Sequence, residues 1–337
     1  MMNTFSEAIQ SATAELLEDK RVHVIGLGAS YKNGLDGTMG DLAERYPEQV
    51  HDVPCSENAI TGTAVGMATA GLLPLVHHGR IEFSFHAFDQ IFNQAAKWSY
   101  MFGGNYQCAL TARIAMGRQW GNGPQHTFTA KGIFAIPGLK VAAPSSPNAA
   151  KNLLLAAVRD PNPVIYLESR WLYKTKETVI DTEMPLDKAR VLRTGKDVTI
   201  VAVADMVIDA LKAARLLANI GVEAEVIDVV SVYPLDIATM RDSVSKTGHL
   251  VTVDASTPSY SIAHEIIAEL GTGVALTCPD TPCPTAPSLA AKYYPTAARI
   301  ASVTLRSLGR ELTFDENYTF EELNLPPTDN FDTQLLK

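Results

Sequence analysis

The sequence has few cysteines, no basic cluster and no long apolar run, and each of these absences excludes a class of protein. It contains only 4 cysteines in 337 residues, which is too few for a disulfide scaffold, and none has the paired spacing of a zinc site. No stretch reaches the roughly 18 apolar residues that a membrane helix needs. The acidic N-terminal segment does not resemble a signal peptide. We therefore expect a reduced, cytoplasmic protein without a membrane partner.

Basic residues are also in deficit. The chain has 28 Lys and Arg against 37 Asp and Glu, which gives a formal net charge of −9. Nucleic acids and anionic membranes repel a protein of that sign, so we expect neither as a partner. The hydrophobic content of 46% is ordinary for a globular protein, and the length suggests two domains.

Several catalytic signatures are missing as well. The sequence has no P-loop, no Gly-x-Ser-x-Gly elbow and no His-x-x-x-His pair, which argues against the corresponding nucleotide hydrolases, ester hydrolases and zinc enzymes. Gly26 and Gly28 follow an apolar strand, but Ala29 and Ser30 come next, so the third glycine of a dinucleotide-binding loop is not in place. A nicotinamide-binding oxidoreductase is therefore the least favoured alternative.

The sequence does contain a regular alternation of short apolar strands and helices. The predicted strands and helices of the first half are strands 22–26, 49–53, 73–77, 108–116, 139–143 and 164–168, and helices 59–72, 86–102 and 147–158. This alternation predicts an α/β fold with a mostly parallel, doubly wound sheet that is covered by helices on both faces.

A polar segment separates this pattern from a second, smaller one. Strands and helices resume with strand 197–204 and with helix 206–220, which Gly221 closes. The later predicted elements are strands 222–229 and 250–253 and helix 261–270. We therefore predict a first domain at residues 1–175, a linker at 176–195 and a smaller α/β domain at 196–337.

Two polar residues lie where the predicted fold would place chemistry. Glu57 follows the second strand and opens a helix rich in small residues, and ligands of open α/β sheets lie beyond the carboxyl ends of the strands. Its alternative is a first-turn acid that the helix dipole stabilises. His126 ends a glycine-rich loop at 121–126, where its alternative is a solvent-exposed imidazole. Position alone leaves both alternatives open.

Short segments spread over residues 5–305 carry a family resemblance through their order and spacing. They read PCSE at 54–57, GTAVGMA at 62–68, FDQI at 88–91, YMFGG at 100–104, QH at 125–126, PGLKV at 137–141, RDPNP at 159–163 and VID at 226–228. With these segments the chain resembles the beta subunit of the thiamine diphosphate-dependent, decarboxylating component of 2-oxo acid dehydrogenase complexes, the pyruvate and branched-chain type. The resemblance implies a transketolase-like pyrimidine-binding domain followed by a transketolase C-terminal-type domain.

The resemblance also implies roles for single residues. Glu57 matches the glutamate that activates the cofactor: its carboxyl group bonds a ring nitrogen of the aminopyrimidine, so that the neighbouring amino group takes the proton from the thiazolium carbon. Burial should favour the neutral form of that carboxyl group. Phe83 matches the aromatic residue that stacks on the pyrimidine, with core packing as its alternative. His126 matches the histidine that contacts substrate as acid or base.

A missing motif suggests that the site is completed by a second chain. The Gly-Asp-Gly signature that holds magnesium and the diphosphate does not occur at a matching position. The resemblance therefore implies an alpha subunit that holds most of the magnesium site, in an α2β2 heterotetramer. It further implies a structural potassium ion at the carbonyl groups of Leu110 and Ala157 with Asp160 and Asn162, although the last two could equally form only a turn.

The chain departs from the family around the predicted site. Leu27 and Gly28 stand where relatives usually have acids, and the run TFTAK follows His126 at 127–131. These changes suggest an altered substrate or acceptor. His77, Arg80 and His86 would suit an anionic or hydroxylated substrate, and their alternative is a role as solvated surface residues.

The leading functional hypothesis is oxidative decarboxylation of a small 2-oxo acid, with transfer of the acyl group to a lipoyl acyltransferase. The alternative is a two-component transketolase-like enzyme that passes a two-carbon unit to a sugar or aldehyde. A third hypothesis is a non-catalytic assembly subunit, and the presence of Glu57 argues against it.

Overall fold

The computed structural model describes residues 2–118, 123–319, 322–323 and 325–336. The chain divides into two compact units, Met1–Met116 with Phe134–Leu186, and Gly117–Ile133 with Asp187–Lys337. The boundary at Leu186 falls inside the segment 176–195 that the sequence predicts as linker. The stretch 117–133, which the sequence-based division counts with the first domain, belongs to the second unit by its contacts.

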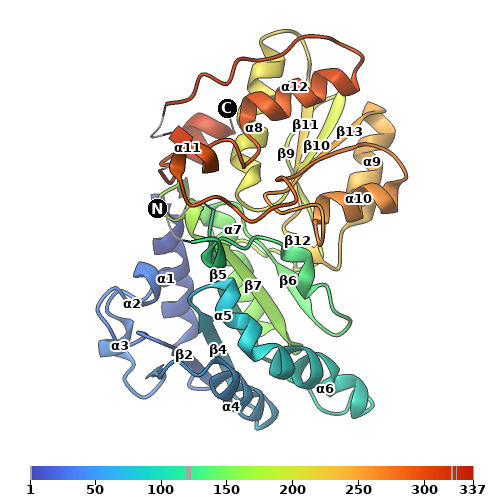
Figure 1. The fold of residues 1–337 in the computed structure, drawn as a ribbon. Helices are drawn as coiled ribbons and strands as arrows, with labels where there is room; N and C mark the ends of the chain where they lie inside the picture. The colour runs from blue at the N-terminus through green and yellow to red at the C-terminus, as the bar shows by residue number, and fades with distance from the viewer. Residues whose placement is uncertain (1, 119–122, 320–321, 324, 337) are drawn as a thin grey trace. The chain divides into compact units, whose positions relative to one another are not determined.

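The first unit is built around a parallel sheet. Its strands are β2 (Val22–Gly26), β3 (Val50–Asp52), β4 (Leu73–His78), β5 (Thr111–Met116), β6 (Lys140–Ala142) and β7 (Val164–Ser169). Along the sheet they stand in the order β6, β7, β5, β4, β2, β3, and each pair is parallel (Figure 1). Every residue of β5 and β7 is buried, so both faces of the sheet are covered, as expected for the predicted α/β fold.

Two long helices of this unit pack against each other. They are α1 (Phe5–Leu16) and α7 (Pro147–Arg159). Helix α1 was not predicted, but its start carries a reciprocal cap: Thr4 accepts a hydrogen bond from the Glu7 amide, and the Glu7 carboxylate accepts one from the Thr4 amide at 2.7 Å. This Thr-x-x-Glu pattern before an apolar run is the sequence signal that marks the helix.

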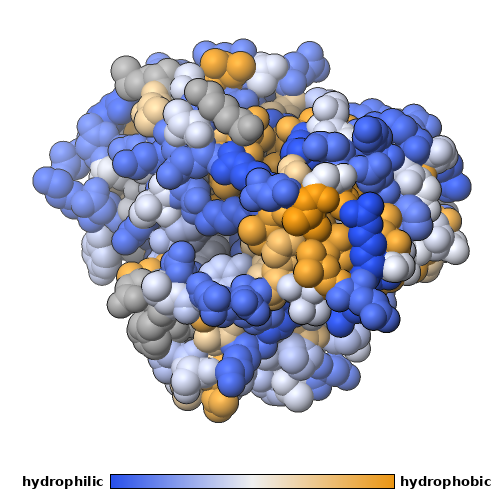
Figure 2. Space-filling model, turned by 90° about the horizontal axis from the view of Figure 1, so that it is seen from above, coloured by the Kyte–Doolittle hydropathy of each residue, from blue (hydrophilic) through white to orange (hydrophobic). Residues whose placement is uncertain are grey.

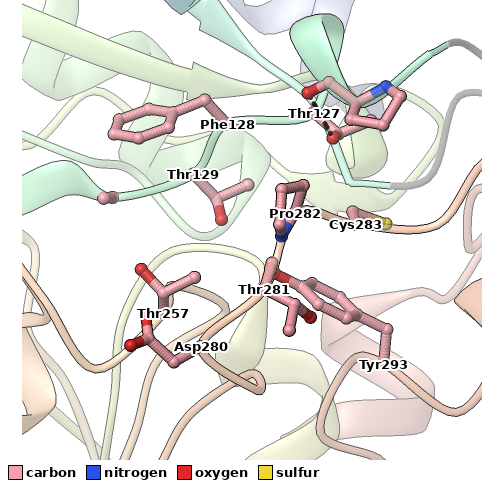
Figure 3. Close-up of a pocket in the computed structure, with 11 residues that line it drawn as sticks. Thr127, Phe128, Thr129, Thr257, Asp280, Thr281, Pro282, Cys283 and Tyr293 are labelled. Atoms are coloured by element: carbon pink, nitrogen blue, oxygen red, sulfur yellow. Dashed lines mark hydrogen bonds between the residues drawn. The ribbon is translucent and has the colours of Figure 1, made fainter.

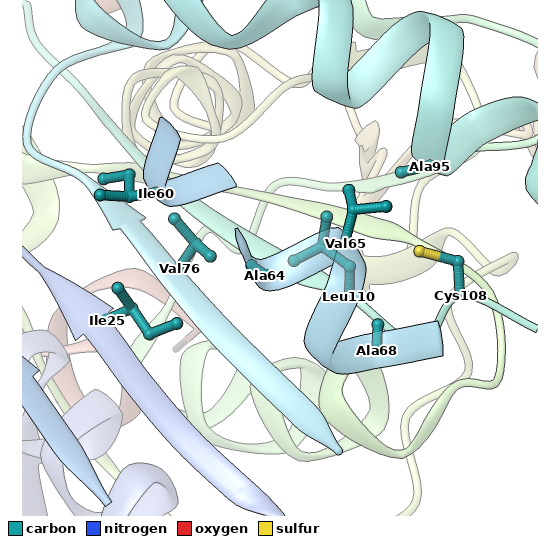
Figure 4. Close-up of a cluster of buried hydrophobic side chains, with 9 residues drawn as sticks. All are labelled: Ile25, Ile60, Ala64, Val65, Ala68, Val76, Ala95, Cys108 and Leu110. Atoms are coloured by element: carbon teal, nitrogen blue, oxygen red, sulfur yellow. The ribbon is translucent and has the colours of Figure 1, made fainter. Parts of the chain in front are cut away.

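Helix α4 (Glu57–Thr69) begins with the predicted site residue Glu57 and packs on β4. Its small side chains Ala64 and Ala68 are buried and allow the helix to approach β2 and β4 closely, whereas Gly66 and Ala70 are exposed. Figure 4 shows the resulting core cluster, which comprises Ile25, Ile60, Ala64, Val65, Ala68, Val76, Ala95, Cys108 and Leu110. The packing of α4 thus fixes its first turn at the edge of the sheet.

The predicted helix 86–102 is a series of shorter helical segments. The helical run begins before it, at α5 (Ile81–Ser84), and continues through a 3₁₀ turn (Phe85–Ala87), a π-helical segment (Asp89–Ala95) and α6 (Ala96–Met101). It ends as predicted, because Gly103 and Gly104 take φ angles of 63° and 79°, which glycine adopts without strain. Wider π turns are uncommon in proteins and often lie at functional sites.

The second unit contains its own sheet of β9 (Arg190–Arg193), β10 (Val198–Ala202), β11 (Ala224–Asp228), β13 (Leu250–Val253) and β14 (Val274–Leu276). In the described residues they stand in the order β14, β13, β10, β11, β9, and only β9 at the edge is antiparallel. The surrounding helices are α8 (Met206–Ala218), α9 (Ile237–Thr247), α10 (Ile262–Leu270) and α12 (Ala297–Ser307), with α12 packed on α8. The sequence predicted α8 and α10 but not α9 and α12.

The face drawn in Figure 2 is mainly hydrophilic, and some large apolar side chains of the chain are exposed. Figure 2 shows one face of the molecule, on which hydrophobic residues gather in one area among hydrophilic ones. On the first unit, four apolar side chains are exposed around the end of α6: Tyr100 (90%), Met101 (56%), Phe102 (44%) and Tyr106 (62%). None of the helices in the described parts of the chain has both the length and the apolar character that crossing a lipid bilayer requires.

Candidate active site

Glu57 is the first residue of α4 and follows strand β3. Its side chain is half-buried, and Ser56, which precedes the helix, makes no side-chain capping bond. The next residue, Asn58, accepts a hydrogen bond from Gln90 Nε2 at 3.1 Å, which ties the first turn of α4 to the π-helical segment. The Glu57 carboxyl group is therefore accessible at a turn whose position is fixed from two sides.

Phe83 comes from a neighbouring part of the same sheet edge. It lies in α5, directly after β4, and its side chain is 36% exposed. Strands β3 and β4 flank β2 and run parallel to it, so the segments that carry Glu57 and Phe83 both leave the carboxyl edge of the sheet. In open α/β sheets this edge binds ligands. The structure thus brings these two predicted residues to one edge.

His126 belongs to the second unit. It ends a one-turn 3₁₀ helix (Pro124–His126), its amide donates to the Gly123 carbonyl at 3.0 Å, and its side chain is half-buried. Thr127 Oγ1 donates back to the Pro124 carbonyl at 3.0 Å, which closes the turn. Gly121 and Asn122 of the predicted glycine-rich loop lie outside the described residues.

A cavity of about 350 Å³ lies beside this turn, within the second unit. One side is formed by the chain that follows His126, and the other by the segment around Asp280 and Tyr293 (Figure 3). Two of its hydroxyl groups are already engaged, since Tyr293 donates to the Thr281 carbonyl at 2.6 Å and Thr129 donates to the Ala255 carbonyl. The chain after His126 therefore borders this cavity, although Thr127 and Thr129 are themselves buried.

The four residues predicted for a potassium site make internal contacts. The carbonyl oxygens of Leu110 and Ala157 accept hydrogen bonds from the Val164 and Asp160 amides at 2.8 and 3.3 Å. The Asp160 carboxylate accepts from the Asn162 amide at 2.9 Å, as in a turn, and also pairs with Lys140. The turn that the sequence offered as the alternative is thus present.

Sequence reasoning missed a buried charge network in the first unit. Arg113 donates to both carboxylate oxygens of Glu168 at 2.9–3.2 Å, and neither side chain is exposed. Tyr173 donates to Glu168 at 3.0 Å, and His77 Nε2 lies 3.4 Å from the same carboxylate. Burial raises the pKa of Glu168, but Arg113 and His77 outweigh it and hold that pKa at about 2. The signal was a charged residue in each of two apolar strands.

The polar residues at 77, 80 and 86, which depart from the family pattern, differ in how deeply they are buried. His77 is buried inside the network, Arg80 is half-buried, and His86 is exposed. Asp36 pairs with Arg170 at 2.6 Å, and burial raises the pKa of Asp36 while Arg170 and His77 lower it. The three residues proposed to meet a substrate thus differ in exposure, and only Arg80 and His86 are accessible.

His78 is a buried histidine beside this network, and it predicts a pH-dependent stability. Burial, with a contribution from His77, lowers the pKa of His78 from 6.5 to about 3. As the pH falls, His78 therefore takes up a proton in the unfolded chain before it does so in the folded protein. The stability that depends on a neutral His78 is complete above pH 6.5 and is lost as the pH falls towards 3. We expect the free energy of unfolding to fall through His78 by up to about 1.4 kcal/mol per pH unit in this window.

Urea unfolding at a series of pH values measures this effect in wild type, in His78→Phe and in the matched control His86→Phe, whose histidine is exposed. The pH slope should flatten in His78→Phe and stay unchanged in His86→Phe. Equal slopes in all three proteins would contradict the assignment.

Comparisons with known proteins agree with this arrangement. Residues 2–176 match the transketolase pyrimidine-binding domain family, and residues 187–300 match the transketolase C-terminal domain family. The chain is 39% identical over 287 residues to the beta subunit of acetoin:2,6-dichlorophenolindophenol oxidoreductase from Cupriavidus necator, covering 82% of this chain and 85% of the relative. It is 42% identical over 276 residues to the mitochondrial pyruvate dehydrogenase E1 component subunit beta-1 of Arabidopsis thaliana, covering 79% and 76%.

A solved structure has a similar fold. A chain described as a split-gene transketolase in an inactive beta4 tetramer superposes with a TM-score of 0.77 at 23% sequence identity, covering 91% of this chain and 99% of the other. This likeness concerns the fold, and it agrees with a pyrimidine-binding unit followed by a C-terminal unit.

Proposed function

Because the chain belongs to the transketolase-like beta subunits of thiamine diphosphate-dependent 2-oxo acid dehydrogenases, we propose that it supplies the pyrimidine half of such an active site and works with an alpha subunit. The reaction is the oxidative decarboxylation of a small 2-oxo acid, with the acyl group passed to a lipoyl partner. The observation that carries this proposal is the half-buried Glu57 at the carboxyl edge of the sheet, beside the segment of Phe83.

These residues suit the aminopyrimidine ring of thiamine diphosphate. A half-buried carboxyl group can bond a ring nitrogen, and the exposed ring of Phe83 offers a face for stacking. When bound, the cofactor supplies the electron sink for decarboxylation. Glu57 would hold the proton that the ring nitrogen shares, and His126 would donate or accept a proton at the substrate.

The remaining parts of the proposal concern partners and ions. We place the diphosphate and its magnesium ion mainly on the alpha subunit, in an α2β2 assembly. The exposed apolar side chains around the end of α6, with Tyr100 at 90% exposure, support a protein partner on the first unit. Potassium is proposed at the Leu110 and Ala157 carbonyls with Asp160 and Asn162. Among the described residues the cysteines are all unpaired, which supports a reducing compartment such as the cytoplasm.

A reconstitution experiment tests the proposed reaction. The purified chain is combined with its alpha partner, thiamine diphosphate and magnesium, and acylation of a lipoyl domain by pyruvate is followed by mass spectrometry. The isolated chain, which lacks the diphosphate half, should bind the cofactor poorly and acylate nothing. Carbon–carbon ligation to a sugar or aldehyde without lipoyl acylation would instead select the two-component transketolase-like alternative.

Substitutions of Phe83 test the stacking role. We expect Phe83→Ala to weaken thiamine diphosphate binding by the reconstituted enzyme more than Phe83→Leu does, because leucine keeps apolar contact but loses the aromatic face. Stacking beyond area burial contributes about 0.5–1.5 kcal/mol, so Phe83→Leu alone should raise the Kd by roughly 2- to 12-fold. Calorimetric titration measures both constants. Affinities equal to wild type in both variants would remove Phe83 from the cofactor site.

A further inference from the structure

The cavity of about 350 Å³ in the second unit lies at the edge of the sheet where open α/β folds bind ligands. The strand order of that sheet reverses at β10, which has β11 on one side and β13 on the other. The chain that leaves the carboxyl ends of β13 and β14 supplies Thr257 and residues 280–283 to the wall, and the stretch 127–130 supplies the opposite part (Figure 3). These lining residues all belong to the second unit.

The chain itself fills part of this edge. Lys131 Nζ lies 2.7 Å from Oδ1 of Asp254, which directly follows β13, and neither side chain is exposed. The other carboxylate oxygen of Asp254 accepts a hydrogen bond from the Ile262 amide at the start of α10, at 3.2 Å. Lys131 does not line the cavity, so its charge is compensated by Asp254 inside the unit and is not offered to a ligand.

The side chains of the wall mainly accept hydrogen bonds. Four of the lining hydroxyl groups use their protons to donate to backbone carbonyl oxygens, and they are those of Thr127, Thr129, Thr257 and Tyr293. Asp280 adds an exposed carboxyl group, which only accepts hydrogen bonds when it is ionised. Among the described residues that line the cavity, none is lysine, arginine or histidine. This wall therefore favours a ligand that donates hydrogen bonds and carries a positive charge.

The rest of the wall is largely apolar. Phe128 and Tyr293 bring aromatic rings to the cavity from its two sides (Figure 3). Aromatic rings attract organic cations through their faces, and the volume falls in the range of roughly 300–1,000 Å³ that is usual for small-molecule sites. Asp280 and Pro282 are exposed, so the cavity opens to solvent on the side of the carboxyl group.

We propose that this cavity binds a small organic cation, an amine with a compact apolar body, and that Asp280 is its counter-ion. The ammonium group would donate to the carboxylate and to hydroxyl oxygens whose protons are already engaged, while the apolar body would lie against Phe128 and Tyr293. Glu57, Phe83 and His126 do not line the cavity, so the site does not depend on the proposed reaction.

Calorimetric titration of the purified chain with benzylammonium tests this site, because the ion joins one ammonium group to one aromatic ring. Benzyl alcohol, which has nearly the same shape without the charge, and benzoate, which has the opposite charge, are the matched probes. We expect benzylammonium to bind about 10-fold more tightly than benzyl alcohol, because hydrogen bonds to charged groups are the stronger ones. Benzoate should bind more weakly than either. Equal affinities for benzylammonium and benzyl alcohol, tighter binding of benzoate, or no binding by any of the three would contradict a cation site.

A pair of variants tests the counter-ion. Asp280→Asn should weaken benzylammonium binding about 10-fold and leave benzyl alcohol binding unchanged. Because Asp280 is exposed, the variant should keep the melting temperature of wild type. Asp242→Asn removes an exposed carboxyl group of α9 that does not line the cavity, and it should leave both affinities unchanged. No loss in Asp280→Asn, or an equal loss in both variants, would overturn the role of Asp280.

A bromine-substituted benzylammonium soaked into crystals of the chain would locate the site through the anomalous scattering of bromine. We expect the bromine between Phe128 and Tyr293, with the ammonium group within hydrogen-bond distance of Asp280. Bromine bound only elsewhere on the chain would refute the proposal.

Discussion

Replacing Glu57 by glutamine should lower kcat of the reconstituted enzyme by about 10³-fold, within the 10²- to 10⁴-fold range of general acid–base groups. Glutamine keeps the size of the side chain and can still make a hydrogen bond, but it cannot share a proton with the pyrimidine nitrogen. Because Glu57 is half-buried at the start of α4 and its neighbour Asn58 keeps the bond to Gln90, the melting temperature should barely change. Steady-state kinetics with saturating cofactor, alongside thermal unfolding, measures both quantities.

A matched control is available in another helix of the first unit. Glu44 lies in the first turn of the short helix α3 (Leu42–Arg45), where it is exposed. Glu44→Gln should leave turnover intact, which would show that removing any first-turn acid is not enough. Full turnover in Glu57→Gln, with the cofactor bound, would instead favour the hypothesis of a non-catalytic assembly subunit.

Replacing Arg113 by methionine should destabilise the chain by about 3–5 kcal/mol, because it leaves the carboxylate of Glu168 buried without its main counter-charge. The pair is fully buried, and Arg113 also donates to Thr38 Oγ1 at 2.9 Å. His77 and Tyr173 remain beside the carboxylate and offset part of the loss. Urea unfolding of the purified chain at pH 7 measures the change.

Two comparisons test whether the buried charge is the cause. Arg159→Met breaks an exposed pair with Glu15, and its effect should stay within about 1 kcal/mol. The double variant Arg113→Met/Glu168→Leu removes both charges and should be less destabilised than Arg113→Met alone. A double variant that loses the full sum of the single effects would show that packing, rather than charge, dominates.

The sheet and its main helices follow from patterns that are local in sequence. The strand Val22–Gly26 and the helix after Glu57 consist mainly of apolar or small residues, so that a buried face can be predicted for each before the fold is known. Helix α1 was not predicted, although the capping box of Thr4 and Glu7 marks its start in the sequence. The helix at 86–102 was predicted as one element, since sequence periodicity does not distinguish an α-helical turn from a π turn.

Some features of the candidate site can be predicted from the sequence, and others cannot. Glu57 and Phe83 each follow a strand, and strand ends can be read from sequence. The partners of Arg113 and Lys131 cannot, because Glu168 is 55 residues away and Asp254 is 123 residues away along the chain. Such pairs depend on strand register and on the assignment of the stretch 117–133 to the second unit, which only the three-dimensional contacts reveal.

Because residues 117–133 belong to the second unit, a single cut in the chain cannot separate the two units. The polypeptide leaves the first unit after Met116, returns at Phe134 and leaves again after Leu186. A fragment that stops at Leu186 would carry Lys131 but not Asp254, and would be made with an orphaned ammonium group and no α10 to receive it. A single cut after Leu186 therefore leaves residues 117–133 on the fragment that holds the first unit, separated from the unit to which they belong.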